Sequence, residues 1–388
     1  MAGRRTQLAL RRKAVGLSQE QLAERLGVDR STVVRWESGE TLPQPWLRPK
    51  IARALQVSVA HLGDLLDDEH ALDEQATERF ERVTAHPASV DLVTVACLRR
   101  QIAQLDARYD QVPSASLLPE AGQSLGQVSF LAGHARGGQV RQALHLAEAE
   151  AATLMGQLVW DASQRRDCAT AITCLDRAVI AARQAGDRVA EGRALLRKSF
   201  VALYGQKHPR DGLALASQAA HITGSVSHVL TGLAPLHTAE AHAMLTDTHA
   251  CEQEIAQAET HLGQVSDDDP AIDLSSVSQL GRLTGSCYLF LGQAGKAAPV
   301  LENTAAAAAG RSKSQAIIYG NLALSLIRQT KIDEATAALR QAIDIVEVNR
   351  GGGGLTIIFG AARELRPWQD LASVRDTYDR LMTLMTAV

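Results

Sequence analysis

The sequence predicts an all-α protein with a small N-terminal domain followed by a long helical array. Three observations support this fold class. Residues that favour helices, such as alanine, leucine and glutamine, are abundant, whereas aromatic residues make up only 4% of the chain. A length of 388 residues favours two or more domains. A hydrophobic content of 46% is sufficient to bury a large core.

Charge is distributed unevenly along the chain. The net charge is −3, but residues 1–66 contain 11 Lys and Arg against 6 Asp and Glu. This N-terminal part therefore carries +5 and the remainder −8. A basic head on an acidic body is the distribution expected when one domain contacts nucleic acid.

A first helix is expected to begin near Thr6, and residues 18–37 then predict two short helices joined by a tight turn. Ser18 is a good N-cap, and Gln21 completes a capping box for the first of these two helices. Gly27 can adopt the left-handed conformation that ends that helix. This pattern predicts a helix-turn-helix.

The second helix of this motif is expected over residues 30–37, with Asp29 as its N-cap. Val33 and Trp36 are three residues apart and face inward. The side chains expected on the outer face are Arg30, Ser31, Val34 and Arg35. In a helix-turn-helix, this second helix enters the major groove of DNA.

Two further helices complete a five-helix domain over residues 1–66. One is expected over residues 46–55 after a loop rich in turn formers, and the other over residues 59–66. Acidic residues then predict a linker or connecting helix over residues 67–87.

Residues 88–388 are predicted to be almost entirely helical. Residues 113–122 (PSASLLPEAG) predict a loop, and Gly351 to Gly354 predict a hinge before the last helix pair. The four glycines lack the following Lys-Ser or Lys-Thr of a phosphate-binding loop.

Small and apolar residues recur along this region with a period of roughly 40 residues. The best copies are Tyr288, Gly292, Ala297 and Leu301, then Leu326, Thr330, Ala335, Leu339 and Ala342, with weaker copies at Ala171, Leu175 and Ala178 and at Gly212, Ala216 and Ala219. The pattern resembles degenerate tetratricopeptide repeats, whose period is about 34 residues. Such repeats stack into a superhelix because a single helix pair cannot bury its apolar face.

The N-terminal motif resembles the Cro and phage-repressor (XRE) type of helix-turn-helix. The resemblance is carried by Leu22, Ala23, Gly27, Val33, Trp36, Glu37 and Gly39. It implies that Arg12, on the preceding helix, forms a structural ion pair with Glu37. Removing either partner of such a buried pair would leave an uncompensated charge.

The same resemblance implies which side chains contact DNA. Gln19 opens the first helix of the motif, where this family touches DNA, and Arg30 and Ser31 stand where base edges are read. Arg35 is expected to read a base or hold a phosphate, and Thr32 to contact a phosphate. The alternative for each residue is a solvated surface side chain.

The segment from Leu92 to Ala220 resembles actinobacterial XRE regulators with a tetratricopeptide-like C-terminal region. This resemblance implies a sequence-specific transcription regulator that binds a palindromic DNA operator as a homodimer. A short peptide is the leading candidate for the signal that its repeats sense, and a small molecule is the next. A partner protein is the third alternative. Asn321 is a tentative ligand contact, and the alternative is that it bonds a neighbouring helix backbone. A different hypothesis is an interaction scaffold whose repeats inhibit a partner, with a secondary DNA-binding head.

Other kinds of site receive little support from the sequence. His237, Glu240, His242 and His249 lack metal-site spacing and are interpreted as an ordinary polar face. The five cysteines are expected to be free core thiols, with a redox sensor as the alternative. No catalytic arrangement is recognised, so we expect no enzyme activity and no cofactor. Without an apolar run of membrane length, the protein is expected to be cytoplasmic.

Overall fold

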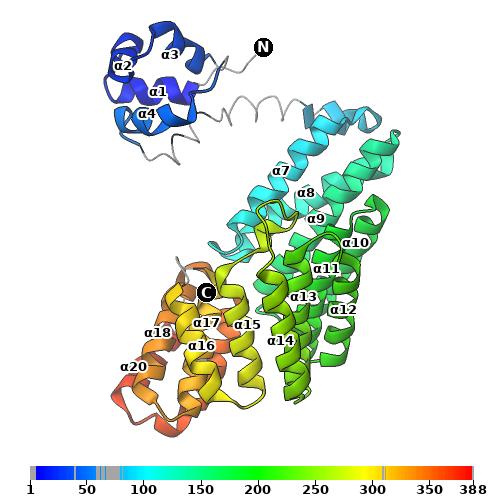
Figure 1. Cartoon of the computed structure of the whole chain (residues 1–388), viewed down its shortest axis with the longest axis vertical. Coiled ribbons are helices and arrows are strands. Elements are labelled where there is room, and N and C mark those ends of the chain that lie inside the picture. The colour runs from blue at the N-terminus through cyan, green and yellow to red at the C-terminus, as the bar shows by residue number, and fades with distance from the viewer. Residues whose placement is uncertain are drawn as a thin grey trace. The chain divides into compact units, whose positions relative to one another are not determined.

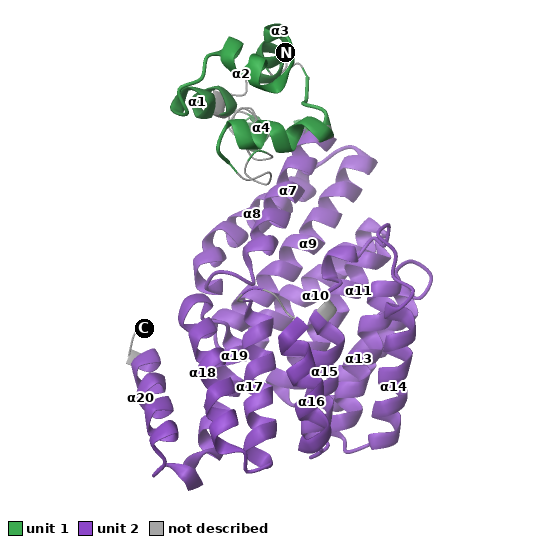
Figure 2. Cartoon of the chain, turned by 60° about the vertical axis from the view of Figure 1, so that its left-hand side comes forward, with its two compact units in different colours: residues 1–89 green, residues 90–388 purple. Residues whose placement is uncertain are grey.

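The computed structural model describes residues 6–38, 41–57, 62, 66, 79–80, 82–307, 310 and 312–386. Within these ranges every regular element is a helix, which confirms the predicted all-α class (Figure 1). The chain divides into two compact units, residues 1–89 and residues 90–388 (Figure 2). No helix of the described part is both long and apolar enough to cross a membrane.

The described part of the first unit includes four α-helices around a small core. They are α1 (Thr6–Ala14), α2 (Gln19–Leu26), α3 (Arg30–Glu37) and α4 (Arg48–Ala54), with 3-10 turns at Pro45–Leu47 and Pro87–Ser89. The predicted capping box of Ser18 and Gln21 is present at the start of α2. Leu22, Val33 and Ile51 are each 1% exposed and bring α2, α3 and α4 together.

The fifth predicted helix lies mostly outside the described residues. Leu62 and Leu66, four residues apart, are helical and buried in the same core. Most of the predicted linker, residues 67–87, is also outside the described ranges. The expected domain boundary at residue 66 therefore stays a prediction.

The second unit is an array of α-helices joined mostly by short connections. The helices are α7 (Leu92–Arg108), α8 (Ser114–His134), α9 (Gly138–Ala162), α10 (Cys168–Ala185), α11 (Arg188–Phe200), α12 (Pro209–Thr223), α13 (His228–Met244), α14 (Thr248–Leu262), α15 (Val277–Phe290), α16 (Ala294–Ala307), α17 (Lys313–Arg328), α18 (Ile332–Asn349), α19 (Gly352–Glu364) and α20 (Ala372–Thr386). A π-helical turn at Val201–Gln206 extends α11, and 3-10 turns lie at Ile272–Leu274 and Arg366–Trp368.

Helix packing in this unit follows the pattern of a repeat protein. Consecutive helices from α7 to α19 pack against each other, and each odd-numbered helix also packs against the next odd-numbered one. The odd-numbered helices therefore form one continuous layer, as in a solenoid of helix pairs.

Small residues allow this close packing, as predicted. Ala171 and Ala178 are fully buried on α10. A Cβ added at Gly156 on α9 would lie 2.9 Å from Cγ of Leu175 on α10. Cβ atoms essentially never approach other atoms so closely, so the two helices can pack at this distance only because Gly156 has no side chain.

The structure corrects the loop predicted at residues 113–122. Residues 114–122 are the first part of α8, Pro113 is its N-cap, and Pro119 lies inside the helix. Proline at that place removes a single backbone hydrogen bond. Leu117 and Ala121 are 0% and 1% exposed on either side of Pro119. Burial of these side chains favours the helix over the loop that the prolines and serines suggested.

The hinge predicted at Gly351 to Gly354 is also wrong. Gly351 is the N-cap of α19, and the three glycines that follow form its buried first turn. A Cβ at Gly352 would overlap the backbone oxygen of Asp161, and one at Gly353 would overlap the guanidinium of Arg165. These glycines therefore allow α19 to approach the end of α9 closely.

Candidate functional site

The recognition helix α3 is fixed in place by a turn and a cap. Gly27 has a φ of 70° and ends α2. The carboxylate of Asp29 accepts a hydrogen bond from the backbone N–H of Ser31 at 2.7 Å. Bonding to Ser31 lowers the pKa of Asp29 below its ordinary value. On the opposite side of α3, Val33 and Trp36 are 1% and 3% exposed and join the core.

A buried ion pair connects α1 to the end of α3. Arg12 and Glu37 form a bidentate pair, with 2.6 Å from Nε to Oε1 and 3.2 Å from Nη2 to Oε2. Both side chains are less than 10% exposed. Nη1 of Arg12 also donates to the carbonyl of Leu17 at 2.6 Å. Because bidentate charge-assisted bonds are directional, this pair fixes the orientation of α3.

Gln19 is joined to the same ion pair. Its Nε2 donates to Oε2 of Glu37 at 2.7 Å, and the residue is half-buried at the start of α2. The side chain predicted to contact DNA is therefore oriented by Glu37, which leaves its amide oxygen as an acceptor.

The outer face of α3 carries the other predicted DNA contacts. Arg30 pairs with Glu20 at 2.9 Å, and both side chains are about 60% exposed. Arg35 reaches back to the carbonyl and hydroxyl of Ser31 at 3.4 Å. Thr32 is half-buried. Exposed pairs of this kind contribute roughly 0–1 kcal/mol, so these guanidinium groups are available to an incoming anion.

The second unit contains a cavity of about 630 Å³. Residues of α7, α9, α11 and α13 line it, together with the segment between α14 and α15. Its apolar lining includes Ile102, Leu146, Leu154, Val189, Leu196 and Leu233. The volume lies within the range of roughly 300–1,000 Å³ that is typical of small-ligand sites.

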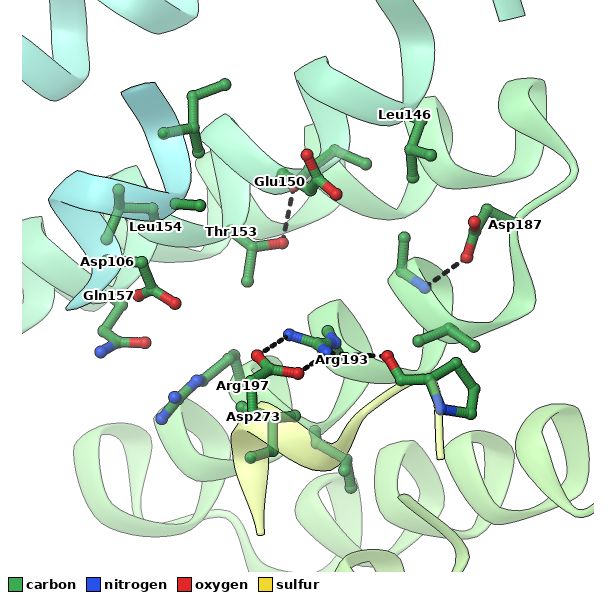
Figure 3. Close-up of a pocket in the computed structure, with 18 of the residues that line it drawn as sticks. Asp106, Leu146, Glu150, Thr153, Leu154, Gln157, Asp187, Arg193, Arg197 and Asp273 are labelled. Carbon is green, nitrogen blue, oxygen red and sulfur yellow. Dashed lines mark hydrogen bonds and ion pairs between the residues drawn. The ribbon is translucent and has the colours of Figure 1, made fainter. Parts of the chain in front are cut away.

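Charged side chains enter the cavity from several helices (Figure 3). Arg99 on α7 pairs with Glu150 on α9 at 2.6 Å. Arg193 on α11 pairs with Asp273 and extends into the middle of the cavity. Arg197, one turn further along α11, points toward the end of the cavity where Gln157 lies (Figure 3).

A buried polar cluster lies between α11, α13 and α15. The hydroxyl of Tyr204 donates to Oε1 of Glu240, and Ser286 is 2.9 Å from the same hydroxyl. Glu240 is 0% exposed, and burial raises its pKa to about 7. His237 is 2.6 Å from the hydroxyl of Ser199, and burial lowers the pKa of His237 to about 3.

These positions correct the prediction of an ordinary polar face on α13. His237 is 2% exposed, so both His237 and Glu240 are core residues. His242 also lies on α13, whereas His249 belongs to α14. In the described ranges no group of three or more His, Cys, Asp or Glu has the arrangement of a metal site.

Asn321 does not lie in the cavity. It is 6% exposed on α17 and is absent from the lining. The arginines that do line cavities, including Arg193, Arg197 and Arg282, were missed from the sequence. One usable signal was the spacing of Arg193 and Arg197, which lie four residues apart on one face of α11.

The helix-turn-helix family profile matches residues 8–62. An uncharacterized HTH-type transcriptional regulator of Methanothermobacter thermautotrophicus is 44% identical over 69 residues, which cover 17% of this chain and 97% of that protein.

Two solved structures are weakly similar to most of the chain. The apo form of the quorum sensor NprR from B. thuringiensis has 13% identity and a TM-score of 0.45, covering 82% of this chain and 90% of that one. PlcR from Bacillus thuringiensis, in complex with the peptide PapR7 and DNA, has 15% identity and a TM-score of 0.30, covering 87% and 98%. Neither likeness bears on the ligand of this chain.

The match to the Methanothermobacter protein is much stronger than these structural likenesses, because 97% of that protein is aligned at 44% identity. The residues that the helix-turn-helix profile matches, 8–62, include α2 and α3. The chain belongs to the helix-turn-helix type of transcriptional regulators.

Proposed function

We propose that residues 1–66 bind a specific DNA operator through α3 and that the second unit controls this binding by taking up a ligand. The exposed face of α3, held by the buried pair of Arg12 and Glu37, is the observation that carries the first part. Arg30 and Ser31 read base edges at the start of α3.

Three further side chains position the protein on the operator. Arg35 reads a second base or holds a phosphate, and Thr32 bonds a phosphate oxygen. Gln19, oriented by Glu37, contacts the backbone or a base at the start of α2.

The operator is palindromic and is bound by a homodimer. One recognition helix reads only a few base pairs, so two copies across half-sites about one turn apart supply the required specificity. The protein acts in the cytoplasm and has no enzyme activity.

The cavity of the second unit binds a short peptide or another small molecule. Its volume and its apolar lining with a few charged groups fit such a ligand. A ligand changes DNA binding only if it binds two arrangements of the helical array with different affinities. The DNA affinity of the dimer then follows the population of the arrangement that the ligand prefers.

Selection of bound duplexes from a random library by the full-length protein tests the proposal. An enriched palindrome whose affinity falls steeply with salt supports a dimeric operator-binding regulator. If nothing is enriched, the selection is repeated with residues 1–66. Failure of that selection as well refutes specific DNA binding.

A further inference from the structure

A second, smaller pocket adjoins the large cavity. Its volume is about 80 Å³, several times the roughly 15 Å³ that one water needs. Gln157, Arg197 and Phe200 line both pockets, so the two spaces meet at these side chains. The small pocket is therefore the polar end of a longer site.

Cations outnumber carboxylates in the small pocket. Its lining contains the cations Arg165, Arg197, Arg282 and Lys313 and the carboxylates Asp110 and Asp161. The pocket therefore has an excess of two positive charges when all six groups are ionised.

One cation and one carboxylate neutralise each other. Lys313 pairs with Asp161 at 2.9 Å, and both side chains are 4% exposed. The carboxylate of Asp161 also accepts bonds from the hydroxyl of Ser114 at 2.7 Å and from the backbone N–H of Gly352 at 2.8 Å. Three donors already bond the two carboxylate oxygens of Asp161, so its charge is compensated by groups other than the arginines.

The three arginines lack such partners. Neither Arg197 nor Arg282 forms a side-chain hydrogen bond or ion pair with any residue of the described ranges. Arg165 stacks on Trp160 with its guanidinium carbon 4.6 Å from the ring centroid. Its Nε is buried and has no acceptor in the described part of the chain.

Partial burial makes these charges unfavourable, because each of the three arginines is half-buried. Desolvation lowers the pKa of Arg282, and this effect exceeds the opposing attraction of the Glu240 and Asp110 carboxylates. Arginine nevertheless stays protonated in proteins, so the positive charge persists. Charged groups removed from water are normally paired, and an anion with planar oxygen geometry matches the guanidinium donors.

We propose that Arg165, Arg197 and Arg282 bind the carboxylate of a ligand whose apolar part fills the adjoining cavity. This inference rests on the proposed ligand-binding role of the second unit and specifies the chemistry of the ligand as an amphipathic acid. The carboxylate belongs either to the C-terminus of a short apolar peptide or to a small apolar acid.

The three arginines come from different parts of the array. Arg165 follows α9, Arg197 lies on α11 and Arg282 lies on α15. A carboxylate bonded to all three therefore connects the end of α9 with α11 and α15. The ion pair of Lys313 and Asp161 lines the same pocket. Occupancy of this site stabilises one arrangement of the array, which is the property that ligand control of DNA binding requires.

The experiment uses the full-length protein and matched probes with and without the carboxylate. The peptide Leu-Val-Leu-Phe is compared with its C-terminal amide, and octanoate with octanamide. Acetate and inorganic phosphate test the bare anions. Calorimetry gives the affinity, and thermal melting gives the stabilisation, both at low ionic strength.

The proposal predicts that at least one acid binds saturably and at least 10-fold more tightly than its amide. Preference for the peptide acid identifies a peptide ligand, and preference for octanoate identifies a small acid. If every acid binds no better than its amide, or if only phosphate binds, the proposal is overturned.

Variants locate the site. In Arg197→Gln and Arg282→Gln, the preference for acid over amide is expected to fall at least 10-fold. Arg188→Gln is the matched control, because Arg188 lies on α11 outside both linings and bonds Ser225. Equal behaviour of the three variants contradicts the assignment.

Melting of the unliganded variants separates binding from a structural role. Because Arg282 forms no hydrogen bond or close ion pair with the described residues, Arg282→Gln is expected to melt close to the wild-type temperature, whereas a structural arginine would lower it. Operator binding by the same preparations is measured independently. A failed acid test with intact operator binding overturns only this inference, and the reverse result overturns only the DNA-binding role.

Discussion

Lys313 at the start of α17 forms a buried ion pair with Asp161 at the end of α9, 2.9 Å from Nζ to Oδ2. The two residues belong to distant repeats, so their pairing brings the later helices of the array onto an earlier one. Ser114 and Gly352 bond the same carboxylate. The junction is completed by Tyr109, whose ring centroid is 4.1 Å from Nζ of Lys313.

Removing Lys313 is expected to destabilise the second unit strongly. Lys313→Met leaves the Asp161 charge buried, which costs roughly 3–5 kcal/mol of unfolding free energy. Lys296→Met is the control, because the pair of Lys296 and Glu252 is about half exposed and contributes roughly 0–1 kcal/mol. Urea denaturation followed by circular dichroism measures both. Equal losses in the two variants would show that the junction is not a stabilising contact.

Two alanine substitutions in α19 are expected to have opposite effects. At Gly352, the new Cβ would overlap the backbone oxygen of Asp161, so Gly352→Ala should lower stability by more than about 1 kcal/mol. At Gly360 a Cβ meets nothing within 4 Å, so Gly360→Ala should raise stability by roughly 0.5–1 kcal/mol. Thermal melting of the two variants provides the comparison. A stable Gly352→Ala protein would argue against close approach at this junction.

The pH dependence of stability should contain a contribution from Glu240. Burial raises its pKa from 4.5 to about 7, so the folded state binds more protons than the unfolded state between these values. Stability from this group is therefore lost as pH rises from about 4.5 to 7.

Glu240→Gln removes this dependence while keeping an acceptor for Tyr204. The variant should gain stability relative to wild type across that pH range, by roughly 3 kcal/mol at most. Burial lowers the pKa of His237 to about 3, so the contribution of His237 to stability increases as the pH rises toward its unfolded pKa of 6.5. This contribution is the same in both proteins and cancels in their difference. Unfolding free energies of the two proteins, measured from pH 4.5 to 8, give the difference. A constant difference across this range would exclude a titrating Glu240.

Arg30→Ala is expected to separate DNA recognition from folding. The exposed pair with Glu20 contributes little, so the unfolding free energy should change by less than about 0.5 kcal/mol. Loss of a bidentate base contact should weaken discrimination at one operator position by roughly 1–3 kcal/mol. Competition binding with single-base operator variants measures this loss. Unchanged discrimination would refute the base-reading role of Arg30.

Local chemistry made the N-terminal motif readable from the sequence. Ser18 with Gln21, Gly27 and Asp29 each determine a helix end through contacts with near neighbours in the chain. Val33 and Trp36 reveal the buried face through their spacing alone. The repeat pattern likewise depended on small residues close in sequence, and it predicted the helical array.

Contacts between distant segments could not be read in this way. The glycines at 351–354 suggested a hinge because the proximity of Asp161 and Arg165 is invisible in sequence. His237 and Glu240 appeared to be surface residues for the same reason, since their burial depends on α11 and α15. The arginines of the two pockets lie on helices or connections that are far apart in the sequence.

The most direct test of the account is the affinity of the full-length protein for its selected duplex and for a scrambled duplex at several salt concentrations. The account predicts that the selected duplex binds at least about 10³-fold more tightly and that both affinities fall linearly with salt on a log–log scale. Equal affinity for the two duplexes at every salt concentration would contradict operator recognition by α3.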